Sequence, residues 1–177
     1  MPIQLDADLP APLVPLAWLV GRWAGAGVVG YPTMEQDLRF GQEVTFAHTG
    51  ESFLEYSSRA WLLDDEGRQG RQLATETGYW RPVEGGVEGG GPGATALEVL
   101  LAHPMGYVEL YTGSVDGPRV TLETDAVVRS RTAAEYTAAT RLYGLVEGDL
   151  LWVLDMAAVG SPLSSHASAR LKRVPTD

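Results

Sequence analysis

The sequence predicts an all-β protein, a single ten-stranded antiparallel up-and-down β-barrel with a short helix near its N-terminus. From Gly21 onward, stretches of β-branched and aromatic residues are separated by Gly, Asp and Pro clusters, and sustained helical periodicity is lacking. The connections are mostly tight turns, which join antiparallel neighbours, whereas parallel pairs need long crossovers. Closing the sheet into a barrel leaves no exposed strand edge.

The elements follow in chain order. Apolar residues around Pro12 and Pro15 predict one or two helical turns that lead into the barrel, namely Leu13, Leu16, Trp18, Leu19 and Val20. Ten strands bounded by Gly, Pro or Asp turns are expected at 22–27, 42–48, 53–62, 72–83, 96–103, 107–114, 119–124, 135–146, 150–159 and 166–174. Residues 1–12 are expected to be a flexible N-terminus, and the Gly-rich stretch 84–94 a mobile hairpin tip.

Length and composition limit the class of protein. The 177 residues suit one domain, 1–177, with a substantial core. The 13 basic and 23 acidic residues give a formal charge of -10, which repels a phosphate backbone, so no nucleic-acid partner is expected. Neither a membrane-spanning stretch nor a secretion signal is recognisable, and a cytoplasmic location is expected. With no cysteine, a metal must rely on His, carboxylate, Tyr or Met.

Three histidines are candidate ligands of a metal or cofactor. His48 and His103 fall in turns, where a structural role is expected. His166 begins the last strand, where strict alternation groups it with Arg170 and Lys172 on the solvated face. Beside a barrel mouth it could still reach a ligand at the opening, so its orientation stays open.

The glycines of the first strand are a second candidate feature. Gly25 and Gly27 share one strand face, which indicates either a sharp bend that closes the barrel or a flat group approaching the backbone. A hydrolase is disfavoured because the chain lacks the Gly-x-Ser-x-Gly motif. A small ligand held inside the barrel is the default hypothesis for a fold of this size.

Several blocks of the sequence resemble the nitrobindin family. Gly21-Arg-Trp-Ala-Gly-Ala-Gly27, followed by Tyr31-Pro-Thr33, is similar to that family's G-x-W-x-G-x-G pattern and its downstream Y-P-T. Further similar blocks follow in order at Gln42-Glu-Val44, Glu76-Thr-Gly-Tyr-Trp-Arg81, Ala102-His-Pro-Met-Gly106, Met156 and Pro162-Leu-Ser-Ser-His166. The resemblance extends from Pro15 to Arg173.

The resemblance implies a barrel similar in outline to fatty-acid-binding proteins, with one haem b per chain near its mouth. His166 matches the axial iron ligand and would be the catalytic residue, with Thr33 on the distal side and Met156 lining the pocket. The glycine motif, with Gly21, Trp23, Gly25 and Gly27, would shape the strand beside the cofactor. The activity implied is nitric oxide binding and isomerisation of peroxynitrite to nitrate. One departure is Ala74, which stands where the family commonly has a distal histidine.

Two other interpretations remain open from the sequence. A haem-free barrel could carry a small apolar or fatty-acid-like ligand, with Arg81, Arg141 or Tyr143 anchoring its polar head. Alternatively, the cavity could be filled by the protein's own side chains, since the chain has five tryptophans. The sequence also leaves open a homodimer formed through an apolar patch.

Overall fold

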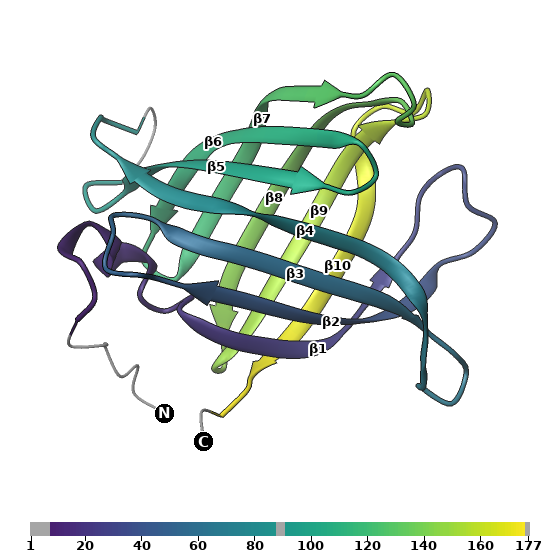
Figure 1. Ribbon diagram of the computed structural model, residues 1–177, viewed down its shortest axis with the longest axis horizontal. Coiled ribbons are helices and arrows are strands. Elements are labelled where there is room, and N and C mark those ends of the chain that lie inside the picture. Colours follow the sequence, from purple (N-terminus) through teal and green to yellow (C-terminus); the bar gives the residue numbers. More distant parts are fainter. Residues whose placement is uncertain (1–7, 88–90, 176–177) are drawn as a thin grey trace.

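The computed structural model, which describes residues 8–87 and 91–175, is a closed barrel of ten antiparallel strands (Figure 1). Each strand pairs with its neighbours in sequence, and β1 pairs with β10 to close the ring. The predicted fold is therefore confirmed. The strands are β1 Gly21–Val29, β2 Leu38–Ala47, β3 Leu54–Leu63, β4 Gln69–Val83, β5 Thr95–His103, β6 Tyr107–Asp116, β7 Arg119–Arg129, β8 Tyr136–Val146, β9 Asp149–Ala158 and β10 Ser164–Arg173.

The two ends of the barrel differ. A 3-10 helix, η1 (Ala11–Leu16), closes one end, where Leu13 and Leu16 are fully buried. The β1–β2, β3–β4, β5–β6, β7–β8 and β9–β10 connections meet at the opposite end, on the right in Figure 1, which we call the mouth. β10, the strand of His166, begins at the mouth.

The predicted N-terminal helix is confirmed, and it begins at Ala11, inside the stretch 1–12 that was expected to be flexible. Residues 1–7 lie outside the described part of the chain. So do residues 88–90, within the predicted hairpin tip between β4 and β5.

Most strands extend beyond their predicted bounds, and β2 shows the physical reason. It begins at Leu38 rather than at Gln42, because Gly41, which resembles a strand breaker, is covered by a side chain of the neighbouring strand. A Cβ built on Gly41 would lie 2.6 Å from Nε1 of Trp61, its cross-strand partner. The indole shields the glycine backbone and replaces the side-chain packing that glycine lacks.

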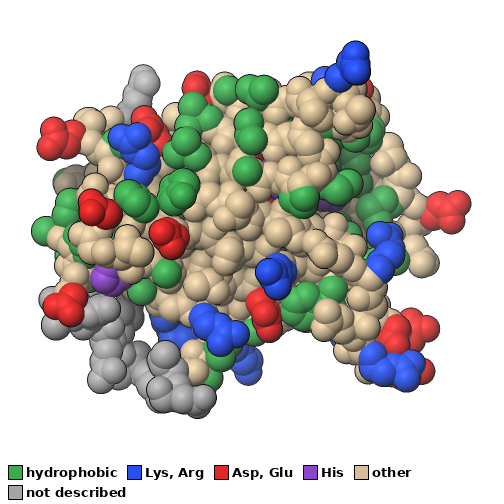
Figure 2. Space-filling model, viewed as in Figure 1, with side chains coloured by type: hydrophobic (Ala, Val, Ile, Leu, Met, Phe, Trp, Pro, Cys, Tyr) green, Lys and Arg blue, Asp and Glu red, His purple; other side chains and the backbone are tan. Residues whose placement is uncertain are grey.

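Alternate residues of the strands build the core. Four of the five tryptophans are buried, namely Trp18, Trp23, Trp80 and Trp152, whereas Trp61 is half-buried on the outer wall. On the face shown in Figure 2, apolar side chains form separate groups among acidic and basic ones. The structure contains no helix, within its described residues, of the length and apolar character needed to cross a membrane.

Candidate functional site

A β-bulge at the start of β10 sets the environment of His166. Ser165 and Ala167 pair with two successive residues of β9, which leaves His166 as the extra residue of the bulge. A bulge interrupts the alternation of side chains and redirects the inserted one. Grouping His166 with Arg170 and Lys172 on the solvated face is therefore wrong, because those two side chains are exposed and His166 is half-buried.

Gly30, the residue that follows β1, fixes the imidazole of His166. Its Nδ1 lies 3.0 Å from the carbonyl oxygen of Gly30, and the Gly30 N–H donates to the His166 carbonyl over 2.8 Å. Because a carbonyl only accepts, Nδ1 carries the hydrogen and donates it, so the neutral ring has its lone pair on Nε2. Burial lowers the pKa of His166 and outweighs the opposing effect of the Gly30 bond. Within residues 8–87 and 91–175, no hydrogen bond engages Nε2.

Tyr31 braces this histidine from the side. Its ring meets the His166 ring edge-on, with the centroids 5.5 Å apart. The Tyr31 hydroxyl accepts the Ala158 N–H at 2.8 Å and donates to the carbonyls of Met156 and Ala158 at 3.0 and 3.1 Å. Thr33 follows in the same loop and is exposed, and Met156 is half-buried. The structure thus brings Thr33, Met156 and His166 to the mouth.

Two members of the glycine motif lie far from this group. Gly21 and Trp23 are at the closed end of β1, where Trp23 pairs with Arg173 and its Nε1–H donates to the Leu19 carbonyl over 2.8 Å. Seven residues along β10 separate Arg173 from His166, which corresponds to about 20 Å. The structure does not bring Gly21 and Trp23 together with His166.

Gly25 and Gly27 allow β1 and β10 to approach closely. A Cβ on Gly25 would lie 2.2 Å from the Arg170 carbonyl oxygen. A Cβ on Gly27 would lie 2.2 Å from the Ser168 carbonyl oxygen and 2.6 Å from Cζ of Phe40. The flat group against Gly27 is the phenyl ring of Phe40, so these contacts favour the interpretation in which the glycines close the barrel.

A polar cluster, which sequence reasoning largely missed, crosses the barrel interior. We call it the interior network, and its members are Arg141, Glu76, Glu109, His103, Tyr56, Tyr111, Tyr136 and Tyr143. The side chain of Arg141 is only 3% exposed, and it donates two hydrogen bonds of 2.9 Å to the Glu76 carboxylate. Its remaining contacts are Tyr111, Tyr143 and Glu109, so every N–H of the guanidinium faces an acceptor.

Glu109 is the second anion of the interior network. It accepts hydrogen bonds from Tyr111 at 2.7 Å and from Tyr136, and its Oε2 lies 2.6 Å from Nε2 of His103. Burial raises the pKa of Glu109, but Arg141 and His103 outweigh it and lower that pKa to about 2. His103 is the last residue of β5, as the predicted strand 96–103 has it, and its side chain is 4% exposed.

The mouth side of the interior is apolar along β2, β3, β4 and β9, whereas His103, Tyr107 and Tyr136 lie at the mouth ends of β5, β6 and β8. Half-buried apolar side chains that pack against the core gather there, including Met34, Leu38, Leu62, Leu73, Ala74, Leu154 and Met156. Ala74 pairs with Ala60 across β3 and β4, so two small side chains meet at the position where the resemblance implies a distal histidine. The side chains that pack here around the opening are therefore apolar and partly buried.

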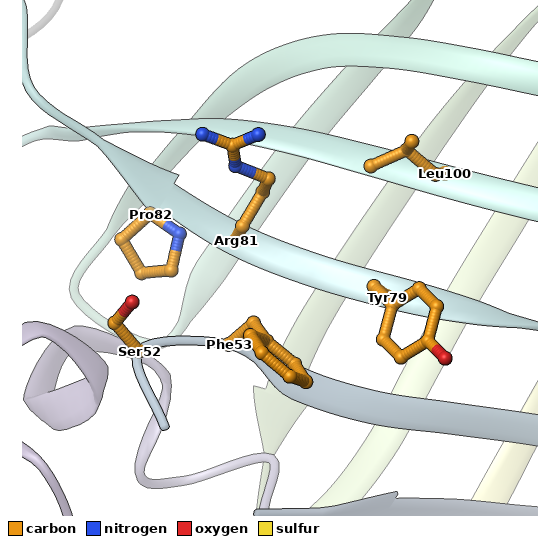
Figure 3. A pocket seen from close by; sticks show the side chains of 6 residues that line it. All are labelled: Ser52, Phe53, Tyr79, Arg81, Pro82 and Leu100. Carbon is orange, nitrogen blue, oxygen red and sulfur yellow. The ribbon is translucent and has the colours of Figure 1, made fainter.

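A separate hollow of about 380 Å³ lies on the outer wall over β3, β4 and β5 (Figure 3). Its lining residues are Ser52, Phe53, Tyr79, Arg81, Pro82 and Leu100. Arg81 is exposed there, with its nearest carboxylate, Glu98, 3.7 Å away. Arg81 therefore faces away from the interior and cannot anchor a ligand inside the barrel.

Comparison with known proteins adds to this geometry. Residues 12–173 match the family model described as THAP4-like, heme-binding beta-barrel domain. A ferric nitrobindin-like protein of Kineococcus radiotolerans is 54% identical, with 98% of this chain and 99% of that protein covered. A peroxynitrite isomerase of Leifsonia xyli subsp. xyli is 47% identical over 97% and 98% of the two chains. The crystal structure of Rv2717c from M. tuberculosis superposes with a TM-score of 0.78 at 36% identity, covering 95% of this chain and 100% of that one.

Proposed function

This chain belongs to the THAP4-like, heme-binding β-barrel family, and on that premise we propose that it binds one haem b at its mouth and isomerises peroxynitrite to nitrate. His166 is the axial ligand in this proposal, and the only one that the protein supplies. The single observation that carries it is the Nδ1–H···O=C bond to Gly30, which fixes the tautomer with a free Nε2. A carbonyl that accepts the Nδ1 hydrogen in this way also orients the ring and raises the basicity of Nε2, the ligating nitrogen in this proposal.

The residues of the mouth fit haem in two further ways. The apolar side chains around the opening can cover a porphyrin face, and Tyr31 holds the imidazole from its edge. A ferric haem held there by His166 would supply Lewis-acid chemistry towards peroxynitrite and an iron that can bind nitric oxide. Ala74 contributes neither a second ligand nor a hydrogen-bond donor on the distal side. The chain's own task is then to hold the iron through His166 and to exclude water with apolar side chains.

The haem-free carrier hypothesis finds less support. Arg81 faces the outer wall, and the N–H groups of Arg141 are already bound to Glu76, Glu109 and two tyrosines. The hydroxyl of the third candidate, Tyr143, accepts an N–H from Arg141 at 3.3 Å. A fatty-acid carboxylate would have to displace an existing carboxylate to reach the buried guanidinium.

The test is a haem titration followed by the Soret absorbance, in wild type, His166→Ala and His48→Ala. His48 is a matched control, since it follows β2 at the closed end of the barrel. We expect stoichiometric binding in wild type and His48→Ala, loss of binding in His166→Ala, and recovery when free imidazole is added to His166→Ala. Equal binding by His166→Ala would refute the ligand assignment. If haem binds but peroxynitrite decay is not accelerated, the isomerase proposal fails while the binding proposal stands.

A further inference from the structure

Tyr136 differs from the other phenols of the interior network. Its hydroxyl donates to Oε1 of Glu109, and no guanidinium contacts it among the described residues. Tyr111 shares the same carboxylate but also accepts an N–H from Arg141 at 2.9 Å, and the guanidinium carbon lies 5.2 Å from its ring centroid. A neighbouring positive charge opposes removal of an electron. Tyr136 is therefore the phenol on Glu109 that loses an electron more readily.

Glu109 is suited to take the proton that oxidation of a phenol releases. A phenol that has lost an electron is a strong acid and gives up its O–H proton to any carboxylate already hydrogen-bonded to it. Arg141 and His103 hold the pKa of Glu109 at about 2, so this carboxylate is ionised at neutral pH and ready to accept. The proton then moves within an existing hydrogen bond, without a rearrangement of the core.

Tyr136 begins β8 at the mouth, and two further rings lie next to it there. The Tyr107 ring centroid lies 4.9 Å from that of Tyr136, and the His103 ring stacks on Tyr107 at 4.2 Å. Tyr107, the first residue of β6, is half-buried, whereas Tyr136 is 6% exposed. In the described part of the chain the Tyr107 hydroxyl has no carboxylate acceptor within hydrogen-bond distance. When a side chain at the mouth loses an electron, Tyr136 therefore replaces that electron and becomes the oxidised residue.

We propose that Tyr136, with Glu109 as its proton acceptor, is a one-electron oxidation site that intercepts nitrogen dioxide radical at the mouth. The radical takes one electron and becomes nitrite, the phenolic O–H bond of Tyr136 breaks, and its proton forms a bond to Glu109. A second nitrogen dioxide radical joins the ring carbon beside the phenolic oxygen. The ring hydrogen then moves to that oxygen, giving 3-nitrotyrosine. The supply of the radical, by O–O homolysis of peroxynitrite, rests on the proposed function, whereas the site itself requires no haem.

The experiment exposes the full-length, haem-free chain to nitrogen dioxide radical made by pulse radiolysis of nitrite. Freeze-quenched samples are examined for a tyrosyl radical by electron paramagnetic resonance, and 3-nitrotyrosine is located among the seven tyrosines by peptide mass spectrometry. Tyr79, 50% exposed on the outer wall, is the internal control for labelling governed by exposure. We expect most of the label on Tyr136 and loss of the radical signal in Tyr136→Phe.

Glu109→Gln tests the proton acceptor, and it should remove the preference for Tyr136. Near-UV circular dichroism checks that this variant is folded. If it is not, Tyr136→Phe and the position of the label in wild type decide the question. Labelling mainly on Tyr79, or an unchanged preference in a folded Glu109→Gln variant, overturns the proposal. Because no haem is used, failure of the haem titration leaves this result intact, and failure here leaves the haem titration intact.

Discussion

Replacing Arg141 with methionine is the sharpest test of the interior network. The substitution removes the only guanidinium that contacts Glu76 and Glu109 among the described residues, and their side chains are 14% and 1% exposed. Two buried carboxylates then lose their shared guanidinium, and of the two only Glu109 keeps a basic side chain, His103, in contact within the described residues. Breaking a buried ion pair in this way costs about 3–5 kcal/mol. Since the total stability of a domain is about 5–15 kcal/mol, Arg141→Met is expected to fold with a much reduced free energy of unfolding at pH 7.

The stability of wild type and that of Arg141→Met are expected to change in opposite directions with pH. In wild type the pKa of Glu109 is lowered from 4.5 to about 2, so this carboxylate stabilises the fold above pH 4.5, and the stabilisation is lost as pH falls towards 2. At about 1.4 kcal/mol per pH unit the loss is about 3 kcal/mol. In Arg141→Met, Glu76 loses the guanidinium that lowers its pKa, so burial raises the pKa of Glu76 and the folded state takes up a proton before the unfolded state does. Its stability is expected to rise as pH falls from 7 to about 5, opposite to the wild-type trend.

Urea unfolding followed by tryptophan fluorescence at several pH values measures both effects in the haem-free protein. Arg170→Met is the matched control, because Arg170 is 51% exposed and its ion-pair partners among the described residues are Asp149 and Glu147. That variant is expected to change stability by less than about 1 kcal/mol. An Arg141→Met variant that loses less than this, or that follows the wild-type pH trend, would refute the electrostatic account of the interior network.

Three further predictions concern the mouth and β1. Tyr31→Phe leaves the buried Ala158 N–H without its hydroxyl acceptor. We expect the free energy of unfolding in urea to fall by about 1–3 kcal/mol and haem to bind more weakly in the Soret titration. Unchanged values for both would contradict the role of Tyr31 in holding His166. Gly27→Ala forces a Cβ into backbone and ring and should cost about 1–3 kcal/mol, while Gly86→Ala, with open space around it, should be close to neutral in the same assay. Because burial lowers the pKa of His166 below 6.5, haem affinity should stay flat from pH 8 to pH 6.5, and a fall centred at pH 6.5 or above would contradict the neutral imidazole.

The sequence predicted the barrel well because strand and turn signals are local. Ten runs of β-forming residues between turn residues give ten strands, and the order of the strands follows from short connections. Strand ends were less predictable where a neighbour decides them, as at Gly41, which stays in β2 because Trp61 covers it. Strict alternation placed His166 on the wrong face, since the bulge depends on the register of β10 against β9 and has no sequence signal in either strand alone.

The interior network shows a different limit. Glu109 stands at an inward position between Tyr107 and Tyr111, and a lone carboxylate in that pattern is a detectable anomaly, because buried charges require partners. The sequence does not say which partners those are. Arg141 is 32 residues away from Glu109 and 65 from Glu76, and only barrel closure brings the three together. The contact of His103 with Glu109 was missed for the same reason, since the two residues meet only once β5 and β6 pair.

The interior network also determines where a ligand can sit. A barrel that stores a fatty acid needs an inward-facing cation with a free N–H. Here the guanidinium of Arg141 is already hydrogen-bonded to Glu76 and Glu109, which neutralise its charge. Opening that cluster for a ligand would leave a buried carboxylate without its partner, at a cost of several kcal/mol. The occupied guanidinium therefore counts against a carboxylate anchor in the core. It supports our proposal that the ligand is held at the mouth, by the nitrogen of His166 that makes no hydrogen bond among the described residues.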